Sequence, residues 1–554
     1  MADKIAFVAY ETPLSPGGGI AAVMGRFPAV MRRVAGRETV VIAPFHHRIG
    51  KVAALDAPAI GEVRVGPQAR RVRIRLFTDP GGIPWYLLEA EDKAFFAGFP
   101  HPYRLADDPA ENGRLLLRDS LLFGAAAAET LGLIGHAAQW LVHLLDWEAA
   151  TAALALDGQR AFLTLHNSYD SGVCDADLLA VGIDPARSRG ATILQRAIPL
   201  VRKPIFTVSK QFALDLTEDV LQTQLMAGHL QDLLRGQLVG VDNGAFASLL
   251  VDEGCLAWAA EGDYGPLASW KLEHRRAALA ALDAHCATDE APIWGDRQRF
   301  SRDLSAPWFI MAGRDDSRQK GYDLAAIAVE EFLARGGDAR FVFFPIPGDE
   351  GLEGLAFLQA LAERFPCQVL ALPFVWREGF LATLRGATFG LMPSLYEPFG
   401  MANEFYLMGA VGVGRATGGI VQQIVPWAGA ASFSHAAAWR ARRWHPDDAA
   451  PTGLLYREPD GIPSAAEDLR RINAADYRLD DPGRSRLAQR RPLALYRAMA
   501  DATRGAIEDA AGLWRRRPDL CQRMLVAGIE HIRRSFTWER TAEEYLAAAN
   551  LAQA

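Results

Sequence analysis

The sequence lacks the features that mark secreted, membrane-spanning or metal-binding proteins. Its five cysteines lie far apart, so they form neither a metal-ligand spacing nor an evident disulfide framework. No run of 18 apolar residues is present, which predicts no membrane span. The N-terminal residues do not show the ordered charged, apolar and small-residue regions of a signal peptide. These absences predict a cytoplasmic protein with reduced thiols, no membrane partner, no metal and no other cofactor.

Charge and length limit the partners and the architecture. The 59 Lys and Arg residues stand against 66 Asp and Glu residues, and the formal net charge of −7 argues against nucleic acid as a partner. The hydrophobic fraction of 50% is typical of a globular protein. Because 554 residues are too many for one core, we expect at least two domains.

The first half of the chain alternates short apolar runs with Ala- and Leu-rich helical patterns, such as those at 119–134 and 147–156. Alternating strands and helices favour a parallel sheet that helices cover on both faces. The strands expected in this half are Ile5–Ala9, Thr39–Ala43, Val72–Leu76, Ala161–Leu165 and Pro204–Val208.

The middle of the chain has a different composition. Residues 251–305 are rich in Ala, Asp, Glu and Arg and contain one amphipathic helical pattern at Trp270–Leu282, so we interpret them as an interdomain segment. A second series of strands and helices follows, which predicts two Rossmann-like sheets in all. The polar stretch 430–490, which includes Asp480–Arg484, is predicted to form loops and insertions. The strands expected in the second series are Trp308–Ala312, Ala339–Phe344, Gln368–Leu372, Phe389–Met392 and Gly412–Gly414.

An acidic residue and a glycine turn follow the strand expected at Phe389–Met392. Glu397 lies in the run Ser394–Gly400, and Thr417–Gly419 comes after the next helical pattern. A strand, loop and helix in this order present backbone N–H groups and the positive end of a helix dipole to an anion. A carboxylate there can accept hydroxyl hydrogen bonds or stabilise developing positive charge. A sugar with a phosphate leaving group requires both features; the alternative is an ordinary turn with a chance Glu-Pro pair.

These residues resemble the bacterial glycogen and starch synthases, which are retaining glycosyltransferases. The family pattern P-S-x-x-E-P-C-G-L corresponds to Pro393–Met401, with Phe399 in place of Cys and Met401 in place of Leu. The family pattern R-x-T-G-G-L corresponds to Arg415–Ile420. The resemblance implies an α/β protein of the GT-B fold, with two Rossmann-like domains facing a central cleft. Further matches follow in the family's order along nearly the whole chain.

Three glycines follow the first expected strand, in the run Pro13–Val23. Glycine lets the backbone approach a ligand closely, although many Rossmann-like proteins have such a loop. The family reads K-T-G-G-L-x-D-V here, so the resemblance implies that Gly18 and Gly19 contact the donor. Pro16 stands at the family lysine and Ala22 at the family aspartate, which leaves ADP-glucose, UDP-glucose or another nucleotide sugar as the donor.

Two blocks in the first half, His143–Trp147 and Leu165–Tyr169, resemble H-x-H-D-W and T-x-H-N in the family. The resemblance implies that Asp146 holds a donor hydroxyl and that His166 hydrogen-bonds the hydroxymethyl group of the sugar. A single histidine after a strand is more often a cap that bonds a backbone carbonyl. The neighbouring Asn167 and the Asp-Trp pair favour the sugar role.

The charged loop Gly313–Gly321 follows the first strand of the second series. The family has R-x-x-x-Q-K-G here, and its arginine and lysine hold the donor phosphates. Arg314 and Lys320 are the matches, and because this loop is one residue longer, Arg318 is a rival for part of the role. Guanidinium can grip phosphate oxygens bidentately, whereas an ammonium acts as a point charge. The alternative is a solvated charged loop.

Two aromatic features complete the resemblance. Trp376 falls where the family places an aromatic side chain near the nucleotide base, and it either stacks on the base or fills the core. The run Ser535–Tyr545 resembles F-S-W-x-x-x-A-x-x-Y and predicts an amphipathic helix. In the GT-B fold this helix crosses back onto the first domain.

We predict a retaining, metal-independent hexosyltransferase that moves glucose from ADP-glucose or UDP-glucose to an α-1,4-glucan acceptor. The expected domains are 1–250 on the acceptor side and 306–525 on the nucleotide-sugar side, with 526–554 as the returning helix. The expected catalytic residues are Glu397, His166, Asp146, Arg314 and Lys320, and the expected donor site adds Gly18, Gly19, Trp376, Thr417, Gly418 and Gly419.

Other functions remain as alternatives. A related retaining glycosyltransferase would use another donor or acceptor, and a catalytically silent protein would bind a sugar nucleotide or a glucan without transfer. A dinucleotide oxidoreductase is disfavoured because the first loop is not G-x-G-x-x-G, and a hydrolase because no G-x-S-x-G elbow follows a strand. A phosphorylase would require a lysine bound to pyridoxal phosphate.

Overall fold

The structure is a computed structural model that describes residues 4–47, 56–135, 139–156, 161–300, 303–348, 350–475, 477 and 486–551. The chain forms two compact units, Met1–Gly244 with Thr537–Ala554, and Ala245–Phe536. None of the helices within the described ranges combines the length and the apolar character that crossing a bilayer requires.

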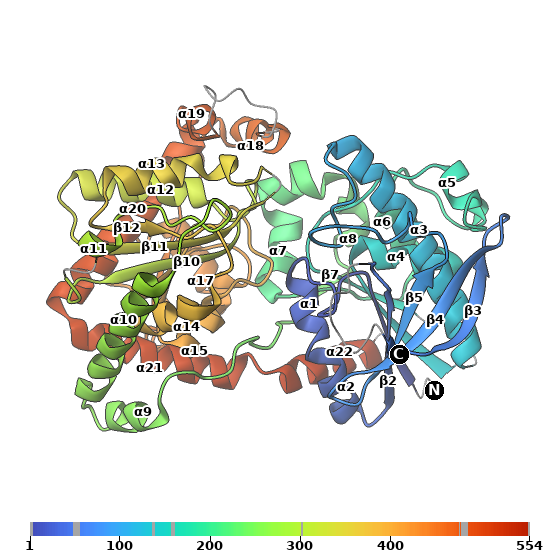
Figure 1. Ribbon diagram of the computed structural model, residues 1–554, viewed down its shortest axis with the longest axis horizontal. Helices are drawn as coiled ribbons and strands as arrows, with labels where there is room; N and C mark the ends of the chain where they lie inside the picture. The colour runs from blue at the N-terminus through green and yellow to red at the C-terminus, as the bar shows by residue number, and fades with distance from the viewer. Residues whose placement is uncertain are drawn as a thin grey trace. The chain divides into compact units, whose positions relative to one another are not determined.

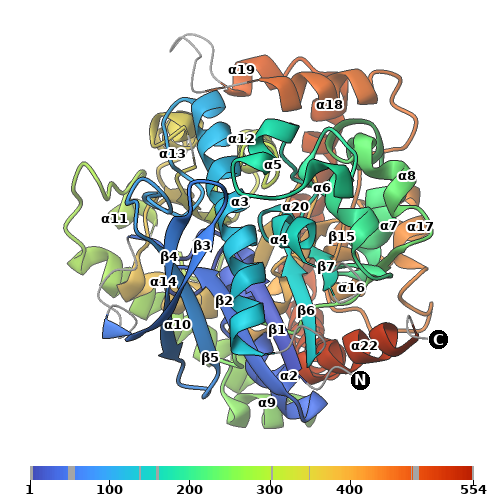
Figure 2. The same cartoon turned by 90° about the vertical axis from the view of Figure 1, so that its right-hand side faces the viewer.

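The first unit is built on a nine-stranded sheet in the order β3-β4-β5-β2-β1-β6-β7-β8-β9. Only β4 runs against the other strands, so the carboxyl ends of the central strands β1, β6 and β7 meet at one edge (Figure 2). The strands are β1 (Lys4–Ala9), β2 (Glu38–Pro44), β3 (Ala59–Val65), β4 (Arg70–Thr78), β5 (Pro84–Ala90), β6 (Trp140–Leu145), β7 (Ala161–Leu165), β8 (Ile205–Thr207) and β9 (Leu238–Gly240).

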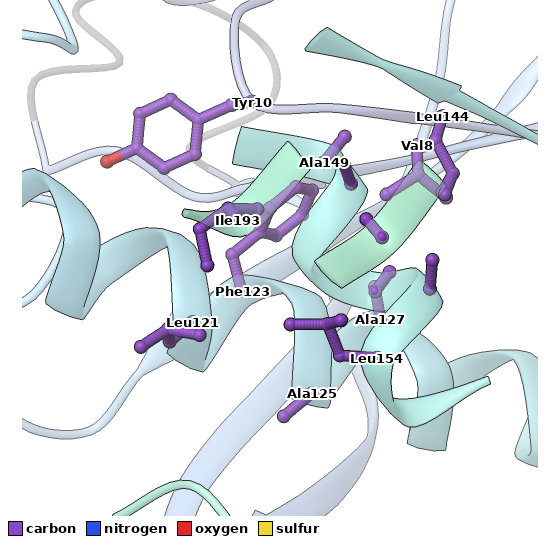
Figure 3. Packing of buried hydrophobic residues seen from close by; sticks show 14 of the residues in the cluster. Val8, Tyr10, Leu121, Phe123, Ala125, Ala127, Leu144, Ala149, Leu154 and Ile193 are labelled. Carbon is purple, nitrogen blue, oxygen red and sulfur yellow. The ribbon is translucent and has the colours of Figure 1, made fainter. Parts of the chain in front are cut away.

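Successive residues of β1 point to opposite faces of this sheet, and each face is covered by helices. Val8 packs in a core cluster with Phe123 of α3 and with residues of α4 (Figure 3). On the other face, Phe7 meets Phe27 of α2 with ring centroids 5.4 Å apart, and Phe27 meets Tyr545 of α22 at 5.4 Å. The helices are α1 (Gly19–Met24), α2 (Phe27–Ala35), α3 (Pro109–Ile134), α4 (Asp146–Ala155), α5 (Asp175–Leu179), α6 (Ile193–Ala197), α7 (Lys210–Glu218), α8 (Gln231–Leu234) and α22 (Trp538–Leu551).

The second unit contains a six-stranded parallel sheet in the order β12-β11-β10-β13-β14-β15. Figure 1 shows α12 and α13 on one face of this sheet and α10, α14 and α15 on the other. The strands are β10 (Trp308–Arg314), β11 (Arg340–Ile346), β12 (Val369–Ala371), β13 (Phe389–Met392), β14 (Val411–Arg415) and β15 (Leu454–Tyr456). The helices are α9 (Glu253–Ala260), α10 (Gly265–Ala284), α11 (Arg297–Phe300), α12 (Tyr322–Ala334), α13 (Ala356–Arg364), α14 (Arg377–Gly386), α15 (Ala402–Met408), α16 (Ile420–Gln423), α17 (His435–Ala441), α18 (Ala465–Ala474), α19 (Arg486–Arg490), α20 (Ala494–Arg516) and α21 (Pro518–Ser535).

The ten strands expected from apolar runs are all present, and their ends agree within two residues. The prediction for 430–490 was wrong, because this stretch contains α17, β15, α18 and α19. Asp480–Arg484 lies outside the described residues. Short helices with many charged residues give only a weak apolar periodicity in the sequence. In α18, for example, Leu469 and Ile472 are the buried apolar side chains.

Residues 251–305 form α9, α10 and α11 and belong to the second unit. Two buried cations of α10 anchor them. Arg275 donates to the carbonyls of Gly386 at 2.8 Å and Ala306 at 3.0 Å, and Lys271 Nζ donates to the carbonyl of Ala387 at 2.7 Å. These cations lie at the carboxyl end of α14, where positive charge is favoured by the helix dipole.

Candidate active site

The candidate site residues of the first unit lie where β1, β6 and β7 end. In open α/β sheets, the carboxyl ends of the strands are the usual place for ligands. Asp146 follows β6 directly, and His166 follows β7 directly. Because β6 and β7 are paired, these two side chains are neighbours.

Asp146 is the centre of this half-site. It is 2% exposed and has a φ of +62°, a left-handed conformation that Asp tolerates better than most residues. Its Oδ1 accepts the backbone N–H of His166 at 2.5 Å, and its Oδ2 accepts Nδ2 of Asn167 at 3.1 Å. The imidazole Nδ1 of His166 lies 3.6 Å from Asp146 Oδ1. The structure therefore brings Asp146, His166 and Asn167 together.

Two further titratable groups, His143 of β6 and Glu148 of α4, are buried in this part of the first unit. Burial, followed by the charge of Asp146, raises the pKa of Glu148 well above its usual range and so favours its protonated form. Burial, followed by His166, lowers the pKa of His143 to about 3, so its imidazole is neutral. His143 Nε2 lies 2.5 Å from Thr164 Oγ1, and its ring packs 5.0 Å from that of Tyr545. His143 thus serves the packing of α22 on the first unit.

The glycine loop after β1 is bound by a buried carboxylate that sequence reasoning missed. Glu11 Oε1 accepts the backbone N–H groups of Gly17 at 3.0 Å, Gly18 at 2.5 Å and Ala21 at 3.0 Å. Its Oε2 accepts the hydroxyl of Tyr103 at 2.9 Å. The Glu11 carboxylate therefore already binds backbone N–H groups of this loop, which the sequence predicted to bind a ligand.

In the second unit, Lys320 and Glu397 meet at the carboxyl ends of β10 and β13. Lys320 Nζ lies 2.6 Å from Glu397 Oε2, which also accepts Ser394 Oγ at 3.0 Å. Gln319 Nε2 lies 3.4 Å from Glu397 Oε1. Glu397 is 7% exposed, whereas 26% of the Lys320 side chain is exposed, so the carboxylate is shielded from water more than the ammonium. A cation and an anion thus stand side by side at the edge where ligands bind.

The Thr417–Gly419 turn passes directly behind Glu397. The N–H of Gly419 donates to the Glu397 carbonyl at 3.2 Å. Gly418 has a φ of +46°, and a Cβ built on it would lie 1.5 Å from the same carbonyl oxygen. Only glycine fits here, which explains the residue type at this position of the turn.

A buried ion pair supports the loop that carries Glu397. The guanidinium of Arg415, at the end of β14, bonds both carboxylate oxygens of Glu458, through Nε at 2.8 Å and through Nη2. Its Nη1 donates to the carbonyl of Leu395 at 2.8 Å. Burial alone would raise the pKa of Glu458, but the cations of Arg415 and Arg457 outweigh it and lower that pKa to about 2.

Glu458 is therefore expected to make the stability of the second unit depend on acid. Because its folded pKa is lowered from 4.5 to about 2, the carboxylate stabilises the fold above pH 4.5 and loses this effect as the pH falls toward 2. At pH 7, Glu458→Gln should lower the free energy of unfolding by about 3 kcal/mol, since it leaves a buried guanidinium unpaired. Urea denaturation at pH 7 and pH 3 measures both values, and the gap between variant and wild type should narrow at pH 3.

An exposed glutamate provides the matched control for this test. Glu467 pairs with Arg470 at 3.0 Å on the surface, with 64% of its side chain exposed. Glu467→Gln should change the free energy of unfolding by less than about 1 kcal/mol at either pH. Equal effects of the two substitutions would contradict the role of the buried pair.

The comparisons with known proteins place this geometry in a family. A sequence model described as the starch synthase catalytic domain matches residues 4–235. The glycogen synthase of Yersinia pseudotuberculosis serotype IB (strain PB1/+) is 28% identical over 429 residues, which cover 74% of this chain and 83% of that protein. The sequence model and these relatives support a protein of the glycogen and starch synthase family. The glycogen synthase of Anaeromyxobacter sp. (strain Fw109-5) is 27% identical over 482 residues, covering 80% and 89% of the two chains.

Solved structures confirm the GT-B fold that the sequence predicted. The catalytic domain of starch synthase IV from Arabidopsis thaliana, bound to ADP and acarbose, aligns with a TM-score of 0.65 at 17% identity over 99% of each chain. Sucrose-phosphate synthase from Thermosynechococcus elongatus aligns with a TM-score of 0.50 at 15% identity over 100% of each chain. The protein is a glucosyltransferase of the glycogen/starch synthase type.

Three other residues predicted for the site of this synthase-like protein differ in how far they are exposed. Arg314 ends β10, with 39% of its side chain exposed and its Nη2 3.5 Å from Asp316 Oδ2. Arg318, the rival cation, is exposed and donates to the carbonyl of Ala475 at 3.4 Å. Trp376 is 2% exposed and stacks on Phe344 with centroids 6.1 Å apart, so in this structure its ring lies in the core.

Proposed function

We propose that this chain transfers glucose from a nucleotide sugar, with ADP-glucose as the first expectation, to the non-reducing end of an α-1,4-glucan with retention of configuration. The observation that carries the proposal is the ion pair of Lys320 with Glu397 at the carboxyl edge of the second sheet. The ammonium of Lys320 can stabilise a leaving diphosphate, and the carboxylate of Glu397 can stabilise the positive charge of an oxocarbenium-like transition state.

Lys320 and Arg314 would stabilise the leaving diphosphate. The ammonium group of Lys320 has three donors, so it can keep its bond to Glu397 while it binds a phosphate oxygen. Arg314 is partly exposed at the end of β10, and its planar guanidinium can bind two phosphate oxygens at once. These two cations would compensate the negative charge of the leaving diphosphate, so the proposed transfer requires no metal.

Glu397 would hold the sugar and support positive charge at its anomeric carbon. In the transfer, the bond from this carbon to the diphosphate oxygen breaks and a bond to the acceptor hydroxyl oxygen forms. The proton of that hydroxyl passes to the leaving diphosphate. The turn at Thr417–Gly419 fixes the backbone of Glu397 through the N–H of Gly419, which would have to leave the Glu397 carbonyl before it could face a sugar or phosphate.

Asp146 and His166 would bind the hydroxyl groups of the glucose. The carboxylate of Asp146 already accepts two hydrogen bonds, and its two oxygens can accept more. Gly19 is the first residue of α1, whereas the N–H of Gly18 would have to leave Glu11 before it could face a phosphate. We therefore propose donor contacts from this loop mainly at Gly19.

Asp146→Asn tests the sugar-binding role with little change of shape. Because Asn also tolerates the left-handed backbone found here, the melting temperature should stay close to that of the wild type. The value of kcat/KM for transfer should fall about 10²-fold, since a charged hydrogen-bond acceptor is lost from the site. Steady-state kinetics and differential scanning fluorimetry measure the two quantities. An unchanged kcat/KM would remove Asp146 from the sugar site.

The donor is tested by kcat/KM for ADP-glucose and UDP-glucose, measured separately through release of the nucleoside diphosphate in the presence of glycogen. We expect turnover of at least one donor and a preference for ADP-glucose. A preference for UDP-glucose would retain the transfer reaction and change only the donor. Release from neither donor by folded protein would contradict the proposed activity.

A second candidate is a catalytically silent protein that binds a sugar nucleotide. It is favoured by Pro16 and Ala22, which replace the family lysine and aspartate, and by Glu11, whose carboxylate occupies loop amides. Calorimetric titration with ADP and UDP distinguishes it from the enzyme. Binding with no release of product would support the silent protein.

A further inference from the structure

The loop that carries Arg314 and Lys320 is held by a pair of buried arginines from a remote part of the chain. Arg486 and Arg490 lie on α19 and are only 4% and 1% exposed. They come from the 430–490 region that the sequence predicted as loops. The proposed activity gives these two cations no role.

Arg486 binds the residue that follows Arg314. Its Nη2 lies 3.0 Å from both carboxylate oxygens of Asp315. Asp315 is itself 3% exposed, and its backbone N–H donates to the carbonyl of Ile346 at 2.8 Å. The Arg486 guanidinium also lies 3.5 Å from Glu350 Oε2 and 4.7 Å from the ring centroid of Phe357.

Arg490 binds the other end of the loop. Its Nη1 donates to Oδ2 of Asp323, in the first turn of α12, at 2.9 Å. The same carboxylate oxygen lies 3.8 Å from Arg486 Nε. Arg490 also donates to the hydroxyls of Tyr477 at 2.6 Å and Tyr496 at 3.2 Å. The two arginines therefore bind Asp315 and Asp323, which flank the segment 316–321.

The far side of this segment is bound to the loop of Glu397. The N–H of Leu395 donates to the carbonyl of Gln319 at 2.7 Å. A Cβ on Gly321 would lie 2.5 Å from the carbonyl oxygen of Pro393, which shows how closely the two loops approach. A shift of the segment would thus move Lys320 relative to Glu397, and small displacements at reacting groups carry large rate penalties.

We infer that Arg486 is a positioning residue for the donor diphosphate: by fixing Asp315 it holds Arg314 and Lys320 in the geometry that binds phosphate. The inference rests on the proposed function for the identity of the ligand. It also explains why a buried carboxylate occupies the position after Arg314 in a loop that is one residue longer than the family pattern. A lysine at 486 would retain the charge but lose the planar guanidinium, whose Nη2 contacts both oxygens of Asp315 while its Nη1 faces Glu350.

The test compares Arg486→Met with Arg491→Met in the full chain. Arg491 lies just beyond α19 and pairs with Glu330 on the surface of α12, with 48% of its side chain exposed, so its loss changes the charge equally without touching the loop. Hydrogen–deuterium exchange of peptides covering 315–321, titration with ADP and UDP, and the KM values for donor and glycogen are measured for both variants.

For Arg486→Met we expect exchange in 315–321 to accelerate about tenfold or more, and the dissociation constant for the nucleotide and the donor KM to rise about tenfold. The KM for glycogen should stay within about twofold of the wild type, and Arg491→Met should match the wild type throughout. Asp315→Asn should reproduce the effect, and the double variant should be no worse than either single one, because both remove the same contact. Asp315→Asn also serves if Arg486→Met does not fold.

Unchanged exchange in 315–321 and unchanged nucleotide affinity in Arg486→Met would overturn the inference, as would equal effects in Arg491→Met. A fall in melting temperature without these changes would assign Arg486 to stability alone. If the wild type bound neither ADP nor UDP, the proposed donor class would fail, whereas the exchange of the loop would still decide whether Arg486 positions it.

Discussion

Replacing Glu397 by glutamine should lower kcat for glucosyl transfer by about 10³-fold, while the affinity for the nucleotide is kept or increased. Glutamine has nearly the same shape but lacks the charge that supports the oxocarbenium-like transition state. It also frees Lys320 from its counter-ion, which lies 2.6 Å away in the wild type, so the ammonium can give more of its charge to the diphosphate. Single-turnover transfer of labelled glucose and calorimetric titration with ADP and UDP measure the two effects.

The control for this variant is Glu378→Gln. Glu378 is an exposed glutamate in the first turn of α14 in the same unit, and its substitution makes the same chemical change on the surface. Glu378→Gln should retain wild-type kcat and nucleotide affinity. A folded Glu397→Gln variant with wild-type kcat would exclude this carboxylate from the chemistry.

Gly418→Ala should inactivate the protein and destabilise the second unit by about 3 kcal/mol. About 1 kcal/mol of this comes from an L-residue in the left-handed region, at a φ of +46°. The rest comes from overpacking, because the new Cβ would lie 1.5 Å from the carbonyl oxygen of Glu397. Relief of that overlap must displace the backbone that carries the Glu397 carboxylate. Urea denaturation and steady-state kinetics measure both losses.

A second glycine separates backbone strain from overlap. Gly461 lies in the same unit, has a φ of +81° and has no heavy atom within 4 Å of a built Cβ. Gly461→Ala should therefore cost only about 1 kcal/mol and leave kcat unchanged. An active Gly418→Ala variant with the denaturation midpoint of Gly461→Ala would show that the turn does not fix Glu397.

The sequence predicts ten of the fifteen strands within the described residues, and most of these ten are apolar runs. The strands β3, β5, β6, β9 and β15 were not expected. Runs such as Phe341–Phe344 in β11 have no other plausible place than a buried strand. The sequence also places His166 and Glu397 after expected strands. The contacts of Asp146 with His166 and of Lys320 with Glu397 are not predicted and become evident only in the structure, where the strand ends share one edge of each sheet.

The sequence does not predict the buried charges that hold these loops. Glu11 and Glu458 come just after apolar runs and Arg486 lies in a charged stretch, and no local pattern marks any of the three as buried. Their burial depends on partners up to 171 residues away, as for Arg486 with Asp315. The periodicity of a short stretch of sequence carries no information about such distant partners. For Glu11, the acid at the end of β1, six residues before Gly17, was the available signal.

Trp376 shows the opposite difficulty. Its position in the family order suggests a base-stacking ring, and the sequence cannot show whether neighbouring aromatic side chains cover it. In the structure Phe344 stacks on it, and a Cβ on Gly379 would lie 1.9 Å from its ring. Stacking on a nucleotide base would require these neighbours to move.

Transfer of glucose onto an α-1,4-glucan can be measured as incorporation of labelled glucose into glycogen. The wild type is incubated with glycogen and labelled ADP-glucose or UDP-glucose, and the washed polymer is digested with an exo-acting α-1,4-glucan hydrolase. We expect label to enter the polymer from at least one donor and to be released by the hydrolase. Folded protein that binds the nucleotide but leaves the glycogen unlabelled with both donors would contradict the proposed transfer.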